Sequence, residues 1–326
     1  MNPQFDDSAA ATQDRLGELK RAIIAFARRA STEISPHDEK LLDGLAQRLP
    51  AGMPIYVAHT PRCSVEDVVR VAVKVQSLGF AASPHLVARR LASERTLRDA
   101  LARLRAQGIE QVLLVAGDLD RPLGPFKSTL EVIATGALEA SGLRRIGVAG
   151  HPEGHRAVGE AELFSALHRK QEFAARSGLA VHIVSQFGFE PASICAWDRR
   201  LTREGISLPV HVGVAGPTAP AKLLKFAIQC GIGTSMSLLM RNIDALKRLS
   251  GFALGPEEML VGLLGGCAGH AGSHLVQPHV YSFGGALATF DWLRSVMEGN
   301  FDLAPNGGSF TVHSSPRTPA IDLGAK

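Results

Sequence analysis

Two histidines and a carboxylate follow a short apolar run near the middle of the sequence. The run Ile146 to Ala149 has the character of a strand buried on both faces. Three ionisable residues then fall within five positions, namely His151, Glu153 and His155. Imidazole and carboxylate groups transfer protons near neutral pH and also bind metal ions. Because α/β enzymes carry their chemistry at strand ends, this turn is the first candidate site.

Further polar residues end or follow the other apolar runs of the chain. In chain order they are Glu33, His59, His85, Asp118, Gln186, Gly213 and Tyr281. Glu33 lies inside its run, so in a barrel its carboxyl group would be desolvated and could donate a proton; the alternative is an outward Glu33 paired with a nearby arginine. Gly117 before Asp118 would let the backbone approach a bound ring. Gln186 offers a donor and an acceptor, which suits the edge of a heterocycle.

Cysteine spacing argues against both a disulfide framework and a zinc ribbon. The four cysteines, Cys63, Cys195, Cys230 and Cys267, lie far apart and form no Cys-X-X-Cys pair. Reduced thiols in the cytoplasm are therefore expected. The spacing of Cys267, His270 and His274 resembles metal ligands on one helix face. Because glycines surround them, a rigid helix is not expected there, and we predict no metal site.

Eight apolar runs alternate with helical patterns from about residue 31 to about residue 298. The runs predict strands at Ser31–Ser35, Ile55–Ala58, Phe80–Ser83, Val112–Ala116, Ile146–Ala149, Val181–Ser185, Val210–Val214 and His279–Phe283. The helical patterns between them span Val65–Leu78, Leu91–Gln107, Ser128–Ser141, Glu160–Ser177, Ala192–Glu204 and Pro220–Gln229. Strands separated by helices must be parallel, because each crossover returns the chain to the same end of the sheet. Eight such units close a (β/α)8 TIM barrel, and the strand-end residues then converge at its mouth.

Glycines mark the boundaries of these units. Gly79, Gly108, Gly142, Gly178 and Gly205 each follow a helical pattern and precede a strand, where a positive φ ends a helix. A doubly wound sheet is the alternative, but no Gly-X-Gly-X-X-Gly follows the first strand. The expected organisation is an N-terminal extension with a helix at Asp14–Arg29 (residues 1–30), the barrel (31–299) and a flexible tail (300–326). Two extra helices, Ser237–Leu249 and Pro256–Cys267, are expected before the last strand.

Composition limits the class of partner. With 326 residues, 45% of them hydrophobic and 20% charged, the chain is expected to be a soluble globular protein with a large core. The net charge of +4 is spread along amphipathic helices, and there are two Trp and two Tyr, so a nucleic-acid-binding face is not expected. The sequence shows no secretory signal and no apolar run of about 20 residues, so neither export nor a membrane partner is expected.

Six short segments of the sequence occur in the same order as the motifs of one known family. They are Thr32–Pro36, Ser83–Leu86, Gly117–Asp118, Val148–His155, His168–Lys170 and Ser185–Phe189. Together, over about residues 31 to 285, they resemble the methylenetetrahydrofolate reductase family, a family of flavin-dependent barrels. Thr32–Pro36 resembles the family's first-strand segment with its Glu, Ser83–Leu86 its His segment, and Gly117–Asp118 its Arg-Gly-Asp turn. Val148–His155 resembles its hallmark fifth-strand motif. His168–Lys170 resembles its Lys-Arg-Lys helix near the flavin phosphates, and Ser185–Phe189 its Thr-Gln-Phe-Phe-Phe strand. Phe226 falls at its mobile stacking phenylalanine.

The resemblance implies that NAD(P)H reduces FAD and that the flavin passes hydride to 5,10-methylenetetrahydrofolate, giving 5-methyltetrahydrofolate. Glu33 would be the general acid at N10, and Asp118 would stabilise the iminium cation. The substrate-binding residues implied are Gln186, Phe226 and Tyr281. The cofactor-binding residues implied are His59, His85, Gly117, Asp118, His151, His155, Arg169 and Lys170. The family also implies a homo-oligomer.

Several residues depart from the family pattern near the flavin. The family commonly has Thr, Arg and Tyr at the positions of Ala58, Ala116 and His151. It commonly has Asp near the position of Leu163, Asn near that of Ala166, and Asn-Arg at that of Gly284–Gly285. These departures leave open a divergent paralogue that binds tetrahydrofolate, holds FAD weakly or not at all, and acts in C1 or demethylation metabolism. A non-catalytic folate-binding protein is another alternative. A metal-dependent barrel hydrolase or lyase that uses His59, His85, His151 and His155 is the alternative from a different class.

Overall fold

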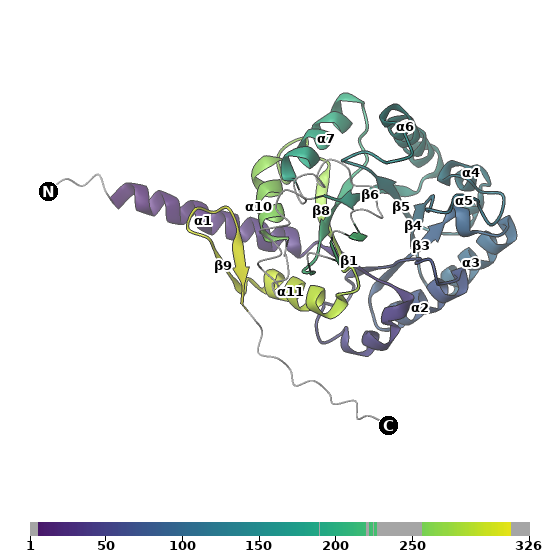
Figure 1. Ribbon diagram of the computed structural model, residues 1–326, viewed down its shortest axis with the longest axis horizontal. Coiled ribbons are helices and arrows are strands. Elements are labelled where there is room, and N and C mark those ends of the chain that lie inside the picture. The colour runs from purple at the N-terminus through teal and green to yellow at the C-terminus, as the bar shows by residue number, and fades with distance from the viewer. Residues whose placement is uncertain (1–5, 189, 220–221, 224, 227–255, 314–326) are drawn as a thin grey trace, which may run out of the picture.

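Eight parallel strands close into a barrel with helices around the outside (Figure 1). The computed structural model describes residues 6–188, 190–219, 222–223, 225–226 and 256–313. The strands are β1 (Ser31–Ile34), β2 (Pro54–Val57), β3 (Ala81–Val87), β4 (Gln111–Val115), β5 (Arg145–Gly150), β6 (Ala180–Phe187), β7 (Val210–Ala215) and β8 (Leu275–Tyr281). Each strand pairs with the next, and β8 pairs with β1. The predicted (β/α)8 barrel is confirmed, and the doubly wound alternative is wrong.

Helices alternate with the strands as the helical patterns predict. They are η2 (Pro36–Gly44), α2 (Val65–Ser77), η3 (Ala88–Arg90), α3 (Glu94–Ala106), α4 (Thr129–Ala134), α5 (Ala137–Ala140), α6 (Glu160–Ser177), α7 (Pro191–Arg203), α10 (Glu257–Gly266) and α11 (Ala286–Glu298). The helix predicted at Ser128–Ser141 is broken in two, because Gly136 adopts a φ of 67° between α4 and α5. The predicted helix Ser237–Leu249 and most of Pro220–Gln229 lie outside the described residues.

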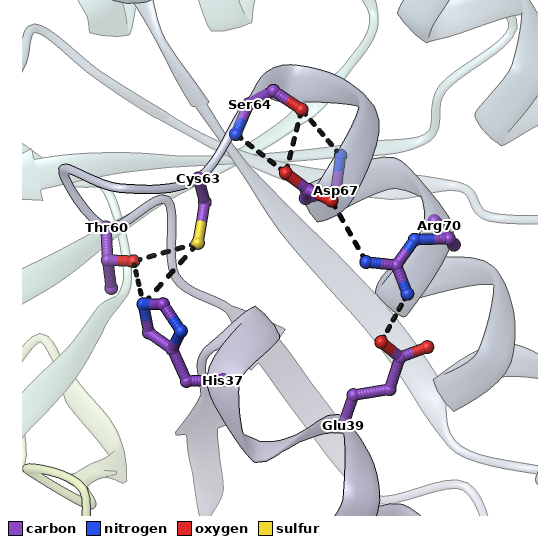
Figure 2. Close-up of polar contacts among 7 residues, drawn as sticks. All are labelled: His37, Glu39, Thr60, Cys63, Ser64, Asp67 and Arg70. Atoms are coloured by element: carbon purple, nitrogen blue, oxygen red, sulfur yellow. Dashed lines mark hydrogen bonds and ion pairs between the residues drawn. The ribbon is translucent and has the colours of Figure 1, made fainter.

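The start of α2 shows how local sequence fixes these elements. The Ser64 hydroxyl accepts the backbone N–H of Asp67 at 3.1 Å, and the Asp67 carboxylate accepts the backbone N–H of Ser64 at 3.0 Å (Figure 2). This capping box satisfies two donors that a helix start leaves open. Arg70 then pairs with Asp67 and with Glu39 of η2, which ties α2 to the segment after β1 (Figure 2).

The bounds of the strands differ from the predicted ones, and the largest differences, in β3 and β8, change where two histidines lie. β3 continues through Pro84 to Val87, so His85 lies inside the strand and not beyond it. A proline lacks the N–H of a sheet ladder, which made Pro84 look like a strand end. Pro84 pairs with β2, and pairing with β4 begins at His85. β8 begins four residues earlier than predicted, so His279 also lies inside its strand.

The chain ends of the described structure pack beside the barrel. α1 (Asp6–Ala27) lies against α10 and α11, and β9 (Phe301–Leu303) pairs with β10 (Phe310–Val312) in an antiparallel hairpin. Phe301 and Phe310 are buried, with ring centroids 4.6 Å apart. The prediction of a flexible tail is therefore wrong for residues 301–312, because two buried phenylalanines hold the hairpin. Residues 314–326 lie outside the described part.

A disulfide joins α7 and α10, contrary to the expectation of reduced thiols. Cys195 and Cys267 form it with Cα atoms 5.5 Å apart. Glycines on α10 allow this approach, since a Cβ at Gly262 would lie 2.4 Å from Pro191 Cγ and one at Gly266 would lie 2.9 Å from Cys195 Sγ. Sequence spacing could not show this tertiary contact. Cys63 is a free thiol, and Cys230 lies outside the described residues.

Within the described ranges, no helix combines the length and apolar character that crossing a bilayer requires.

Candidate functional site

The barrel interior contains a polar layer of neutral rings. Tyr56 Oη lies 2.9 Å from His182 Nε2 and accepts a hydrogen bond from Gln111 Nε2 at 3.1 Å. The His182 ring stacks on His211 with centroids 4.1 Å apart. Burial lowers the pKa of His182 to about 4 and that of His211 to about 2, so both rings are neutral near pH 7.

Gly147, on β5, leaves the space that this layer occupies. A Cβ there would lie 2.9 Å from Leu113 Cδ1 and 3.0 Å from His182 Nε2. The glycine is therefore required by the interior of the barrel rather than by the turn that follows it.

Glu33, which pairs with Tyr56 in the register of β1 and β2, faces inward. Its side chain is 14% exposed, and Glu33 Oε2 lies 3.9 Å from His279 Nε2. His279 is fully buried, and its Nδ1 is 2.9 Å from the Ser31 hydroxyl. The alternative of an outward Glu33 paired with Arg28 or Arg29 is wrong, because the Glu33 carboxylate lies beside the buried His279. Arg28 instead donates to the Met297 carbonyl at 3.1 Å, and Arg29 lies over the Phe26 ring.

Aromatic rings continue from His279 across the same side of the mouth. The Tyr281 ring contacts His279 with centroids 4.6 Å apart, and its hydroxyl donates to the Ser185 carbonyl at 2.9 Å. Phe283 stacks on Phe226 with centroids 4.7 Å apart. Leu223 and Phe187 pack against this group, which forms an apolar cluster separate from the main core. Gln186, on the inner face of β6, is half-buried next to Phe187.

His59 follows the end of β2, and His85 lies within the neighbouring strand β3, two residues before its end. His59 Nε2 donates to the Cys63 carbonyl at 2.9 Å, and burial lowers the pKa of His59. Burial also lowers the pKa of His85, to about 4. The other nitrogen of His59, Nδ1, and Nε2 of His85 are buried and form no hydrogen bond with a described residue. Such atoms are costly to leave unpaired, so these two nitrogens are suited to a bound ligand.

The turn after β2 carries a further polar group at this mouth. Thr60 Oγ1 lies 3.3 Å from His37 Nε2 and 3.1 Å from Cys63 Sγ (Figure 2).

Asp118 forms an ion pair that the sequence did not indicate. Its Oδ1 accepts Arg90 Nη2 at 3.0 Å, while 66% of the Asp118 side chain is exposed. Gly117 has a φ of 92°, and a Cβ there would lie 2.4 Å from Val87 Cγ1. Glycine is thus required both by the backbone conformation and by the close approach to β3.

The turn after β5 brings His151 and His155 together, with ring centroids 5.1 Å apart. Burial, together with the smaller effects of the neighbouring His155 and Lys170, lowers the pKa of His151 to about 4. Burial also lowers the pKa of His155. The backbone N–H of Ala157 donates to His155 Nδ1 at 3.2 Å, which orients that ring within the turn.

A cavity of about 500 Å³ lies between this turn, α6 and α7. Its lining includes His151, Glu153, Lys170, Trp197 and Arg200. Lys170 is 7% exposed and forms no ion pair with a described residue, and burial lowers its pKa to about 8. A buried ammonium is costly, and a bound anion would offset that cost.

Arg169, the neighbour of Lys170, is exposed and does not line this cavity. The structure therefore separates two residues that the sequence groups as phosphate contacts.

The predicted site residues thus fall into three groups around the mouth. Glu33, Tyr281, Gln186 and Phe226 lie on the β6, β8 and β1 side; His59, His85, Gly117 and Asp118 on the β2 to β4 side; His151, His155 and Lys170 beside β5 and α6. Sequence reasoning missed His279, Ser31, Arg90 and the layer around Tyr56. The period-two alternation of inward residues could have shown the first two.

No group of three metal-ligating side chains occurs among the residues that the structure describes. Of the suggested ligands, Cys267 is in the disulfide, and His274 Nδ1 is 3.0 Å from Asp198 Oδ1.

Comparison with known proteins identifies a family whose sequence model matches this chain. A sequence model of the family described as methylenetetrahydrofolate reductase matches residues 35–248, which include every residue from His59 to Phe226. Similar solved structures include dihydropteroate synthase from Thermus thermophilus, 14% identical, over 78% of this chain and 88% of that one, with a TM-score of 0.42. Triosephosphate isomerase from Bartonella henselae is 12% identical, over 83% of this chain and 98% of that one, with a TM-score of 0.40.

Proposed function

This chain belongs to the methylenetetrahydrofolate reductase family, and from that premise we propose that it is a flavin-dependent oxidoreductase. It would interconvert 5,10-methylenetetrahydrofolate and 5-methyltetrahydrofolate with NAD(P)H as co-substrate. The observation that carries the proposal is the position of Glu33, whose largely buried side chain lies next to His279, the ring that contacts Tyr281 at the edge of the aromatic cluster. A proton donor next to an aromatic surface suits a pterin substrate.

Glu33 would act on the folate ring. Its proton passes from the carboxyl oxygen to N10, the bond from N10 to the bridging carbon breaks, and a cationic iminium remains at N5. Asp118, on the opposite side of the mouth, would stabilise that positive charge. Gln186 would bind the pterin edge, while Tyr281 and Phe226 supply the apolar surface on which the ring lies.

The residues beside β5 fit the phosphates of a dinucleotide. Lys170 presents a buried ammonium to the cavity, and His151 lies next to it. His59, His85, Gly117 and His155 would contact other parts of the cofactor, and the exposed Arg169 would contact only an outer phosphate. FAD, when bound, accepts hydride from NAD(P)H and supplies it to the folate.

A second candidate is a folate-binding paralogue that holds FAD weakly. One observation favours it: Leu163 and Ala166, which replace polar residues of the family, line the cavity beside Lys170. The side of the cavity lined by Leu163 and Ala166 therefore offers a bound nucleotide fewer hydrogen-bonding groups than the Asp and Asn common in the family would offer.

Titration separates the two candidates. The purified protein is titrated with FAD, followed by its absorbance near about 450 nm, and with tetrahydrofolate, followed by calorimetry. The reductase requires both ligands to bind. Tight folate binding with no flavin binding would rule out the flavoenzyme and leave the paralogue. The oligomeric state, expected to be a homo-oligomer, is measured on the same sample by light scattering.

A further inference from the structure

The environment of Glu33 contains one unexplained buried atom. Nε2 of His279 is fully buried and forms no hydrogen bond with a described residue. Glu33 Oε2 lies 3.9 Å from it. This separation exceeds hydrogen-bond length, and catalytic hydrogen bonds commonly tighten when substrate binds. A small rotation of the Glu33 side chain would close the gap and satisfy both groups.

The Ser31 hydroxyl is the hydrogen-bond partner of the other ring nitrogen of His279. It lies 2.9 Å from His279 Nδ1, and both groups are fully buried. When the hydroxyl donates to Nδ1, the proton of the neutral ring must lie on Nε2. The imidazole then presents an N–H to the carboxyl group of Glu33.

We propose that His279, oriented by Ser31, is a positioning residue for Glu33. Its Nε2–H binds Oε2, which leaves Oε1 to carry the proton toward the substrate and stabilises the carboxylate that remains after transfer. This inference rests on the proposed function, because it assigns the partner of the general acid in that reaction.

The other titratable groups around this pair do not take over the role. His85 on β3 interacts with Glu33 through charge, and burial lowers its pKa to about 4, so it stays neutral near pH 7. Tyr56 on β2 and Tyr281 on β8 meet the His279 ring in edge contacts, each with centroids 4.6 Å apart. The Tyr56 hydroxyl is hydrogen-bonded to His182 and Gln111, and the Tyr281 hydroxyl to the Ser185 carbonyl. Burial keeps both His182 and His211 neutral near pH 7.

The kinetic test compares His279→Phe, His279→Gln and Ser31→Ala in the FAD-loaded enzyme. His279→Phe keeps a ring but removes the donor, so kcat for the folate half-reaction should fall by about 10- to 100-fold, with KM changed by less than about threefold. A donor to a carboxylate favours its ionised form, so removing it should move the alkaline limb of the pH–kcat profile upward by about one pH unit.

His279→Gln should recover part of kcat, because its amide can donate to Oε2. His182→Phe is the matched control, since it alters another interior imidazole and should leave the midpoint of the profile in place. The proposal would be overturned if His279→Phe and His279→Gln lost kcat equally and the midpoints of their pH–kcat profiles stayed at that of the unsubstituted enzyme. His279 would then have a structural role.

A second measurement does not depend on turnover. ¹⁵N spectra are recorded on protein labelled at its histidines, and the His279 signals are those missing from the spectrum of His279→Phe. These signals should show the Nε2–H tautomer. Ser31→Ala should alter the tautomer. An Nδ1–H tautomer would overturn the positioning role even in an active enzyme. If the protein shows the Nε2–H tautomer but reduces no folate, the proposed function is contradicted, whereas the inferred orientation of His279 is not.

Discussion

His182 makes the stability of the barrel dependent on pH. It is 5% exposed, it is bonded to Tyr56 Oη, and burial lowers its pKa from 6.5 to about 4. Because the folded pKa is the lower one, the unfolded chain binds the proton more readily. The stability that the neutral ring contributes is therefore present above pH 6.5 and is lost progressively as the pH falls toward 4.

The size of this effect follows from the two pKa values. The full shift corresponds to about 3 kcal/mol, of which about 2 kcal/mol is lost by pH 5. In His182→Asn the proton-binding group is absent. The variant should be less stable than the parent at neutral pH, since packing and the bond to Tyr56 change, but its stability should depend less on pH.

Urea unfolding followed by circular dichroism at about pH 7.5 and about pH 5 measures this difference. The drop in unfolding free energy between the two pH values should be smaller by about 2 kcal/mol in His182→Asn than in the parent protein. His270→Asn is the control, because His270 is exposed, and it should show the parental drop. An unchanged drop in His182→Asn would refute the assignment of a buried neutral imidazole.

Three further outcomes follow from the structure. Gly147→Ala should lower the unfolding free energy by about 1–3 kcal/mol, since its Cβ would contact Leu113 and His182 at 3.0 Å or less; a Tm equal to that of the parent would contradict this packing. Reducing the disulfide between Cys195 and Cys267, which are 72 residues apart, should lower the free energy of unfolding in urea by about 4 kcal/mol. Three or more reactive thiols in the denatured protein before any reductant is added would mean that the disulfide is absent. Lys170→Met should weaken binding of ADP by about tenfold in calorimetry, whereas Arg169→Met should change it little; equal effects would show that the cavity does not bind the phosphates.

The barrel was predictable because its signals are local. Apolar runs, helical periodicity and glycines with positive φ at helix ends, such as Gly178 at 71°, each act within one unit of the chain. Glu33 could be recognised as a candidate because it lies within a predicted strand, but the sequence left its inward and outward orientations open. These features depend on neighbours in sequence, so the sequence alone could show them.

The rest depended on contacts between distant segments. The ion pair of Arg90 with Asp118 and the proximity of Ser31 to His279 join residues from different strands or loops. His279 is separated from Ser31 by 248 residues, and it becomes a neighbour only when β8 closes the barrel onto β1. The hairpin at residues 301–312 was missed for the same reason, since its phenylalanines are buried against other elements.

Anaerobic stopped-flow on the FAD-loaded protein tests the central claim most directly. NAD(P)H should bleach the flavin band near about 450 nm, and 5,10-methylenetetrahydrofolate should then restore it. In Glu33→Gln the bleaching should persist while restoration is lost, because only the second step needs the proton at N10. A flavin that NAD(P)H does not reduce, or restoration at the parental rate in Glu33→Gln, would contradict the account.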